Sequence, residues 1–154
     1  MPDKETLERA EEDKREGKSP STQAGEFVRE EMDHIREGKH GARSTKQAIA
    51  IGLSKARRAG VKLPAPKKGT ASSRTRRQAS RDSAKGKSGQ RKVSSTRWRA
   101  TRRALKREGR SAASRTALAR QARKAAAKRS KASRSRAAKK AASTRRRFSS
   151  SKRK

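Results

Sequence analysis

The chain has 154 residues and a formal net charge of +34, with 27% hydrophobic, 2% aromatic and 40% charged residues. So few apolar side chains cannot offset the entropy of ordering the whole chain, and no run of about 18 apolar residues is present that would span a membrane. The absence of Cys excludes disulfides and thiolate metal sites and is typical of a reducing compartment.

Charge divides the chain near Pro64. Residues 1–63 carry 14 Lys and Arg against 12 Asp and Glu, whereas residues 64–154 carry 34 against 2. A block this cationic repels itself until a polyanion neutralises it, so we expect a nucleic acid as the partner. The acidic, Lys-rich start lacks the apolar core of a signal peptide, and we expect a cytoplasmic, nucleoid-associated protein with no membrane contact.

Residues 1–20 read as a mixed-charge arm. Residues 3–16 are good helix formers, but Leu7 and Ala10 are their only apolar members. A helix with so little to pack against is expected to be frayed and solvated. The segment Gly17-Lys18-Ser19-Pro20 is expected to interrupt it.

Residues 21–63 predict two amphipathic helices. The first begins at Ser21 or Thr22 and ends before Gly38, and its apolar residues share one face: Ala24, Phe27, Val28, Met32 and Ile35.

The second helix opens with the capping-box spacing Ser44-x-x-Gln47, runs to about Ala59 and stops at Gly60. Gly52 in its interior costs about 1 kcal/mol relative to Ala, or marks a close helix contact. Because six residues join the two helices, an antiparallel hairpin is the simplest arrangement. We expect this hairpin to be only marginally stable alone, and a homodimer could form through it.

Residues 64–95 begin with two prolines and continue rich in Ser, Arg, Lys and Gly, which predicts a linker. Residues 96–154 predict a nucleic-acid-binding tail, with a short helix over 96–108, an Ala-rich segment over 111–128 and no helical period from 129 to 154. The expected fold class is therefore mostly α plus disorder: a small antiparallel helical hairpin followed by a long disordered cationic tail with transient helices.

The sequence offers few candidate catalytic or metal-binding residues. His34 and His40 lack a third ligand at metal spacing, so we expect solvated histidines, no metal and no cofactor. The carboxylates of the first hairpin helix fit an exposed, ion-paired surface better than an acid/base pair; they are Glu30, Glu31, Asp33 and Glu37. The sequence predicts no enzyme and no small-molecule substrate.

Binding has much more to draw on, because 21 of the 34 cations in residues 64–154 are Arg, whose planar fork grips phosphate bidentately. Trp98 stands among arginines and either stacks on a base or packs against Leu105. The candidate nucleic-acid contacts of the tail are Arg97, Trp98, Arg99, Arg102, Arg103, Arg120, Arg123, Lys124, Lys128, Arg129, Lys139, Lys140, Arg145, Arg146 and Arg147.

The hairpin contributes five further candidates, Lys46, Lys55, Arg57, Arg58 and Lys62. Their spacing allows them to lie along a phosphate backbone. Two alternatives stay open: an ordinary polar outer face, or neutralisation of the acidic first helix at Glu30, Glu31 or Glu37 within the hairpin or a dimer.

A resemblance to a known family covers Glu26 to Pro64, EFVREEMDHIREGKHGARSTKQAIAIGLSKARRAGVKLP. This segment resembles a small domain of unknown function found in short basic bacterial proteins, with the recurring core KQAIAIGLS-A-R-AG, and the resemblance implies no activity or site. The tail is similar in composition to the cationic tails of linker histones and bacterial histone-like proteins, although it prefers Arg and Ser to Lys and Pro: RSAASRTALARQARKAAAKRSKASRSRAAKKAAS.

The function we expect is non-enzymatic and largely sequence-independent DNA binding by a histone-like protein, through phosphate neutralisation and counterion release. Duplex DNA is favoured as the partner. One alternative is association with RNA or the ribosome. Another is a protein-interaction or dimerisation module that its tail tethers to nucleic acid.

Overall fold

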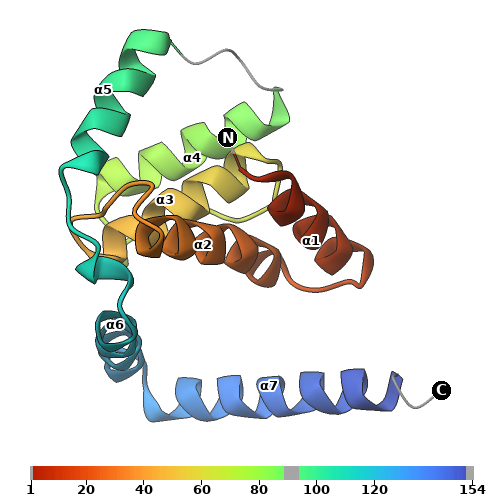
Figure 1. Cartoon of the computed structure of the whole chain (residues 1–154). Helices are drawn as coiled ribbons and strands as arrows, with labels where there is room; N and C mark the ends of the chain where they lie inside the picture. Colours follow the sequence, from red (N-terminus) through yellow and green to blue (C-terminus); the bar gives the residue numbers. More distant parts are fainter. Residues whose placement is uncertain (1, 89–93, 152–154) are drawn as a thin grey trace. The chain divides into compact units, whose positions relative to one another are not determined.

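Helices make up the regular structure of residues 2–88 and 94–151, the residues that the computed structural model describes (Figure 1). Side chains are described as far as Arg146. The chain divides into two units, Met1–Ala117 and Leu118–Lys154. The α-helices are α1 (Lys4–Arg15), α2 (Pro20–Arg36), α3 (Thr45–Arg58), α4 (Ser73–Lys87), α5 (Ser95–Lys106), α6 (Arg115–Ala127) and α7 (Lys131–Ser151), and the 3₁₀ helix η1 covers Ser111–Ala113.

The predicted hairpin is present as α2 and α3, which pack against each other. The predicted cap of α3 is confirmed, because Ser44 Oγ accepts a hydrogen bond from the Gln47 amide at 3.2 Å. A Cβ on Gly52 would lie 2.7 Å from the Cα of Val28 on α2. Gly52 therefore marks a close helix contact, the second of the two interpretations that the sequence allowed.

The start of α2 differs from the prediction. Ser19 is the N-cap and Pro20 the first helical residue, so Pro20 opens the helix instead of interrupting the chain. Proline is well suited to this position, because its fixed φ is helical and its missing N–H has no partner in the first turn.

The expectation of a solvated N-terminal arm is wrong. α1 packs on α2 and buries Thr6, Ala10 and Asp13 at helical spacing. An ion pair of 2.8 Å between Arg9 Nε and Glu26 Oε2 also joins the two helices. Small and polar side chains make this contact, which is why the search for large apolar residues missed it.

The expectation of a linker without structure over residues 64–95 is also wrong, because α4 packs on α3. Asp82 of α4 is 1% exposed and accepts hydrogen bonds from Ser54 Oγ (2.7 Å) and Arg58 Nε (2.8 Å), both on α3. A Cβ on Gly86 would clash with the carbonyl oxygen of Arg57, so α4 approaches the end of α3 closely.

The segment after α5 is fastened to the turn between α2 and α3. The Gly41 amide donates to the Leu105 carbonyl at 2.9 Å, and the Ala42 amide donates to the Gly109 carbonyl at 3.1 Å. Thr45 Oγ1 donates to the Ala112 carbonyl at 2.7 Å. The 3₁₀ helix η1 is thereby held against α2 and α3, so the first unit extends well beyond the hairpin.

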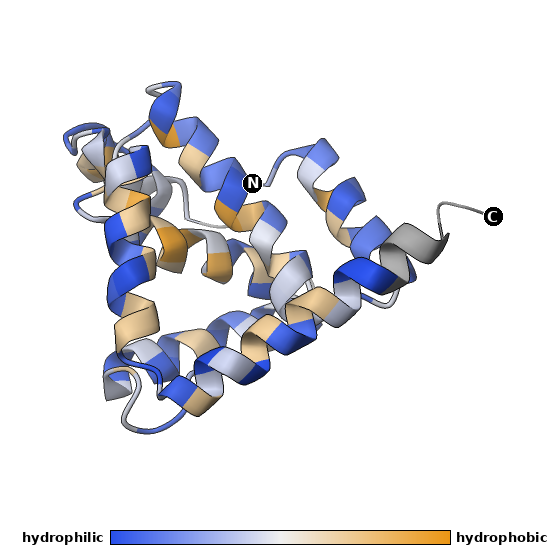
Figure 2. Cartoon of the chain, turned by 90° about the horizontal axis from the view of Figure 1, so that it is seen from below, coloured by the Kyte–Doolittle hydropathy of each residue, from blue (hydrophilic) through white to orange (hydrophobic). Residues whose placement is uncertain are grey.

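The predicted disordered tail is contradicted as well, since α6 and α7 continue the helical structure to Ser151. Ala, Arg and Lys are among the best helix formers, and this propensity opposes the charge repulsion on which the prediction of disorder rested. Over its described side chains α7 has no stripe of large apolar residues, and in Figure 2 the helix that leads to the C-terminus carries blue residues interspersed with pale and tan ones. Of the described helices, none is long and apolar enough to cross a membrane.

Candidate nucleic-acid interface

Four cations lie on one face of α5, at positions i, i+3, i+4 and i+7: Arg99, Arg102, Arg103 and Lys106. This spacing places side chains on one face of a helix, and we call the set the α5 stripe. Its length of about 10 Å, at 1.5 Å per residue, matches a stretch of duplex DNA that carries about six phosphate charges.

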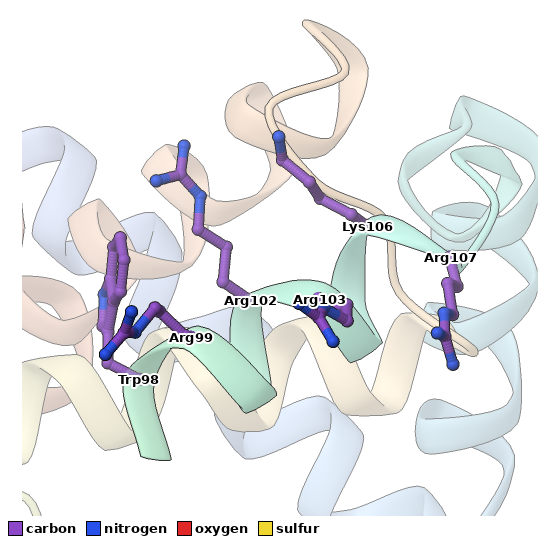
Figure 3. Close-up of a pocket in the computed structure, with 6 residues that line it drawn as sticks. All are labelled: Trp98, Arg99, Arg102, Arg103, Lys106 and Arg107. Atoms are coloured by element: carbon purple, nitrogen blue, oxygen red, sulfur yellow. The ribbon is translucent and has the colours of Figure 1, made fainter. Parts of the chain in front are cut away.

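Trp98 lies beside the α5 stripe and is 50% exposed. The guanidinium carbon of Arg102 lies 5.0 Å from the centroid of its ring, a cation–π contact. The same residues line an open pocket together with Arg107, the residue that follows α5 (Figure 3). An aromatic face next to guanidinium groups suits a nucleotide, which offers a base to stack and a phosphate to bind.

The charge of the α5 stripe is not neutralised within the described parts of the chain, because none of its four cations forms an ion pair there with a carboxylate. Like charges three or four residues apart destabilise a helix by about 0.2–0.5 kcal/mol per pair. An anion that binds along the stripe relieves this repulsion, so α5 is a surface that favours a polyanion.

The structure places three of the five hairpin candidates in internal contacts. Lys55 Nζ lies 2.9 Å from Glu30 Oε1 and 2.8 Å from Glu31 Oε2. Burial lowers the pKa of Lys55, but its hydrogen bonds to Glu31 and Glu30 outweigh this effect and the pKa is raised. Lys55 therefore neutralises the acidic first helix of the hairpin, which is one of the alternatives that the sequence left open.

Arg57 and Arg58 are also engaged within the fold, but not with the first helix. Arg57 is 7% exposed and donates to the carbonyls of Leu63 (3.3 Å) and Pro64 (3.2 Å), and burial lowers the pKa of its guanidinium. Arg58 is bound to Asp82. Lys46 and Lys62 are exposed.

The tail candidates lie on exposed helical surface or beside it. Arg97, Trp98, Arg99, Arg102 and Arg103 are on α5; Arg120, Arg123 and Lys124 are on α6, with Lys128 and Arg129 just after it; Lys139, Lys140, Arg145 and Arg146 are on α7. Arg147 belongs to α7, but its side chain lies outside the described residues. The structure thus gathers the five α5 candidates on one helix.

Sequence reasoning missed two features that position this surface. The first is Asp82, one of only two acidic residues after Pro64, which is buried against α3. The second is the attachment of residues 105–113 to the turn at Gly41. The sequence signal for this attachment is the glycine at position 41 itself. In the structure a Cβ there would clash with the carbonyl oxygen of Glu108, a close approach that glycine permits.

Comparison with known proteins identifies one similarity. Residues 17–68 match the model of a family of unknown function (DUF6496), in agreement with the resemblance to an uncharacterised domain noted in the sequence. No curated protein and no solved structure matches the chain. The matched segment covers α2 and α3 with the turn between them and ends before α4.

Proposed function

We propose that this protein is a non-enzymatic DNA-binding protein that contacts the phosphate backbone with little sequence preference, and that it associates with the nucleoid for this reason. The observation that carries the proposal is the α5 stripe, four cations on one helical face beside an exposed Trp98.

Charge supports this assignment over a surface that is merely solvated. Residues 64–154 contain 34 Lys and Arg and two acidic residues, Asp82 and Glu108. Asp82 is buried in its contact with Arg58, which leaves Glu108 as the one described carboxylate beyond α4. Almost no carboxylate in this part of the chain competes with a phosphate for the cations of α5.

The way α5 is attached also supports the proposal. The carbonyl of Leu105, near the end of the helix, accepts a hydrogen bond from Gly41, and Ala112 and Ala113 are buried at η1. A binding helix whose end is fastened to a packed scaffold loses less conformational entropy on binding than a free tail. The positive charge of α5 attracts the phosphate backbone, and the attachment to the hairpin orients the end of α5.

The test is the salt dependence of binding to a short duplex DNA of random sequence, measured by fluorescence anisotropy with the full chain. Replacing three residues of the α5 stripe with Gln, at Arg99, Arg103 and Lys106, should lower the slope of log K against log salt by about 2.7, at 0.9 per phosphate contact.

The matched control removes three charges from exposed positions on α1, with Gln at Lys4, Lys14 and Arg15. The control should keep the slope of the unchanged chain. If both triple variants lower the slope equally, binding depends on net charge and the assignment to α5 fails.

The kind of nucleic acid is tested by competition at one fixed salt concentration. Duplex DNA, single-stranded DNA and a structured RNA compete for the full chain against a labelled duplex. Stronger competition by the RNA would replace the DNA assignment with RNA binding, for which exposed Trp98 offers a stacking surface.

A further inference from the structure

A cluster of charged and titratable side chains lies between α2, α3 and the turn that joins them. Glu31 is fully buried and the side chain of Glu30 is 3% exposed. The side chains of His34 and His40 are 13% and 15% exposed. The expectations of solvated histidines and of Glu30 and Glu31 on an exposed face are therefore wrong.

The charges of the cluster do not balance. Glu30, Glu31 and Asp3 contribute three carboxylates, whereas among the described residues Lys55 is the one Lys or Arg in direct contact with Glu30 and Glu31. The exposed Lys39 pairs with Glu37 at 2.9 Å and acts on Asp3 and Glu30 only at longer range. The cluster thus has an excess of two negative charges next to two imidazoles, in surroundings where uncompensated charge is costly.

The orientation of His40 turns its second nitrogen toward Glu31. Nδ1 lies 3.1 Å from the carbonyl oxygen of Gly41, which only accepts, so Nδ1 carries the hydrogen. Nε2 lies 3.3 Å from Glu31 Oε1. In its neutral form, an imidazole in this orientation points a lone pair at a carboxylate oxygen that has no hydrogen-bond partner among the described residues.

The 3.3 Å between His40 Nε2 and Glu31 Oε1 suits two ligands of one metal ion. With bonds of about 2.1 Å and tetrahedral angles, a His nitrogen and a carboxylate oxygen on zinc lie about 3.4 Å apart. Ligand atoms of Glu31, His34 and His40 all lie within 4.8 Å of one another. A small adjustment of these side chains would bring all three within reach of one ion.

His34 is oriented by a carboxylate. Its Nε2 lies 3.0 Å from Asp3 Oδ2, to which it donates a hydrogen, and this leaves Nδ1 as the nitrogen with a free lone pair. Histidines that bind metal usually donate their other N–H to a carboxylate or a backbone carbonyl. His34 with Asp3 and His40 with Gly41 both have this arrangement.

We propose that Glu31, His34 and His40 bind one divalent transition-metal ion, of which Zn²⁺ fits this set of nitrogen and oxygen ligands well. Neutral imidazoles and one divalent ion bring the charge of the cluster to zero. Lys55 holds the other oxygen of Glu31 at 2.8 Å. The ion joins α2 to the turn at His40, next to Gly41, which fastens the segment after α5.

The test uses the full chain, freed of metal with EDTA and titrated with Zn²⁺ by calorimetry, with imidazole nitrogen NMR as a second readout. We expect one equivalent of Zn²⁺ to bind, to raise the midpoint of thermal unfolding and to shift both His resonances. Because the chain has no Cys and only these two His, imidazole-dependent binding reports on this cluster.

Removing Glu31 also takes a partner from Lys55, so the test variants are His34→Gln and His40→Gln, with circular dichroism as the check on folding. Both should lose zinc binding. The control Glu37→Gln changes an exposed carboxylate close in sequence and should bind zinc as before. Zinc binding that persists in both His variants would overturn the proposal, and so would two doubly protonated imidazoles in excess Zn²⁺.

Discussion

Replacing Asp82 with Ala tests the contact between α4 and α3. Asp82 accepts hydrogen bonds from Ser54 Oγ, Arg58 Nε and Gln78 Nε2, at 2.7, 2.8 and 3.0 Å. The first two cross between the helices. Both bonds are made to a carboxylate, and a hydrogen bond to a charged group contributes about 1.5–3 kcal/mol, so the two together contribute about 3–6 kcal/mol.

The expected loss lies near the lower end of that range, about 3 kcal/mol, because the side chain of Arg58 is 45% exposed and water replaces part of its bond. Urea denaturation followed by circular dichroism measures the free energy of unfolding. Hydrogen exchange locates the change, and amides of α4 should lose protection before those of α2 and α3.

The control is Asp33→Ala, which removes a surface ion pair whose side chains are 44% and 48% exposed. Such pairs contribute about 0–1 kcal/mol. If Asp82→Ala is no more destabilising than this control, and protection of α4 is unchanged, then the carboxylate does not hold α4 in place and the reasoning fails.

Further predictions concern glycines and the exposed aromatic. Gly52→Ala should lower the free energy of unfolding by about 1–3 kcal/mol in urea titrations, because the added Cβ would lie 2.7 Å from the Cα of Val28 and 2.9 Å from the carbonyl oxygen of Phe27, backbone atoms that cannot move aside without shifting α2. Gly86→Ala should release α4 by a clash with the Arg57 carbonyl, detected as faster proteolysis near residue 73. Trp98→Ala should weaken binding to single-stranded DNA by about 1–3 kcal/mol in anisotropy titrations and leave the salt slope unchanged, whereas an equal effect on duplex DNA would contradict base stacking.

The sequence predicts α2 and α3 well, because large apolar side chains repeat there with a helical period. α1 and α4 also bury one face, but that face is Thr6, Ala10 and Asp13 in one helix and Ala79 and Asp82 in the other. An apolar period does not detect faces made of small and polar residues. The polar residues of these faces bind other side chains, and the sequence alone does not show which side chains those are.

The nucleic-acid candidates could be found from charge alone, but charge did not distinguish cations that are already engaged from those that are available. Lys55 and Arg57 are engaged within the fold, whereas the α5 stripe is available. The buried histidine cluster carried one signal. Glu31 follows Phe27 by four residues and precedes Ile35 by four, which places a carboxylate in the middle of the apolar stripe of α2.

The attachment of η1 to the hairpin sets an order of events during synthesis. Thr45 bonds to a residue 67 positions later and Arg36 to one 77 positions later. The hairpin emerges from the ribosome first, yet its turn stays without these partners until residue 113 has followed, since a chain folds only as its segments appear. By then the cations of α5 have already emerged, among the RNA phosphates that surround every nascent chain.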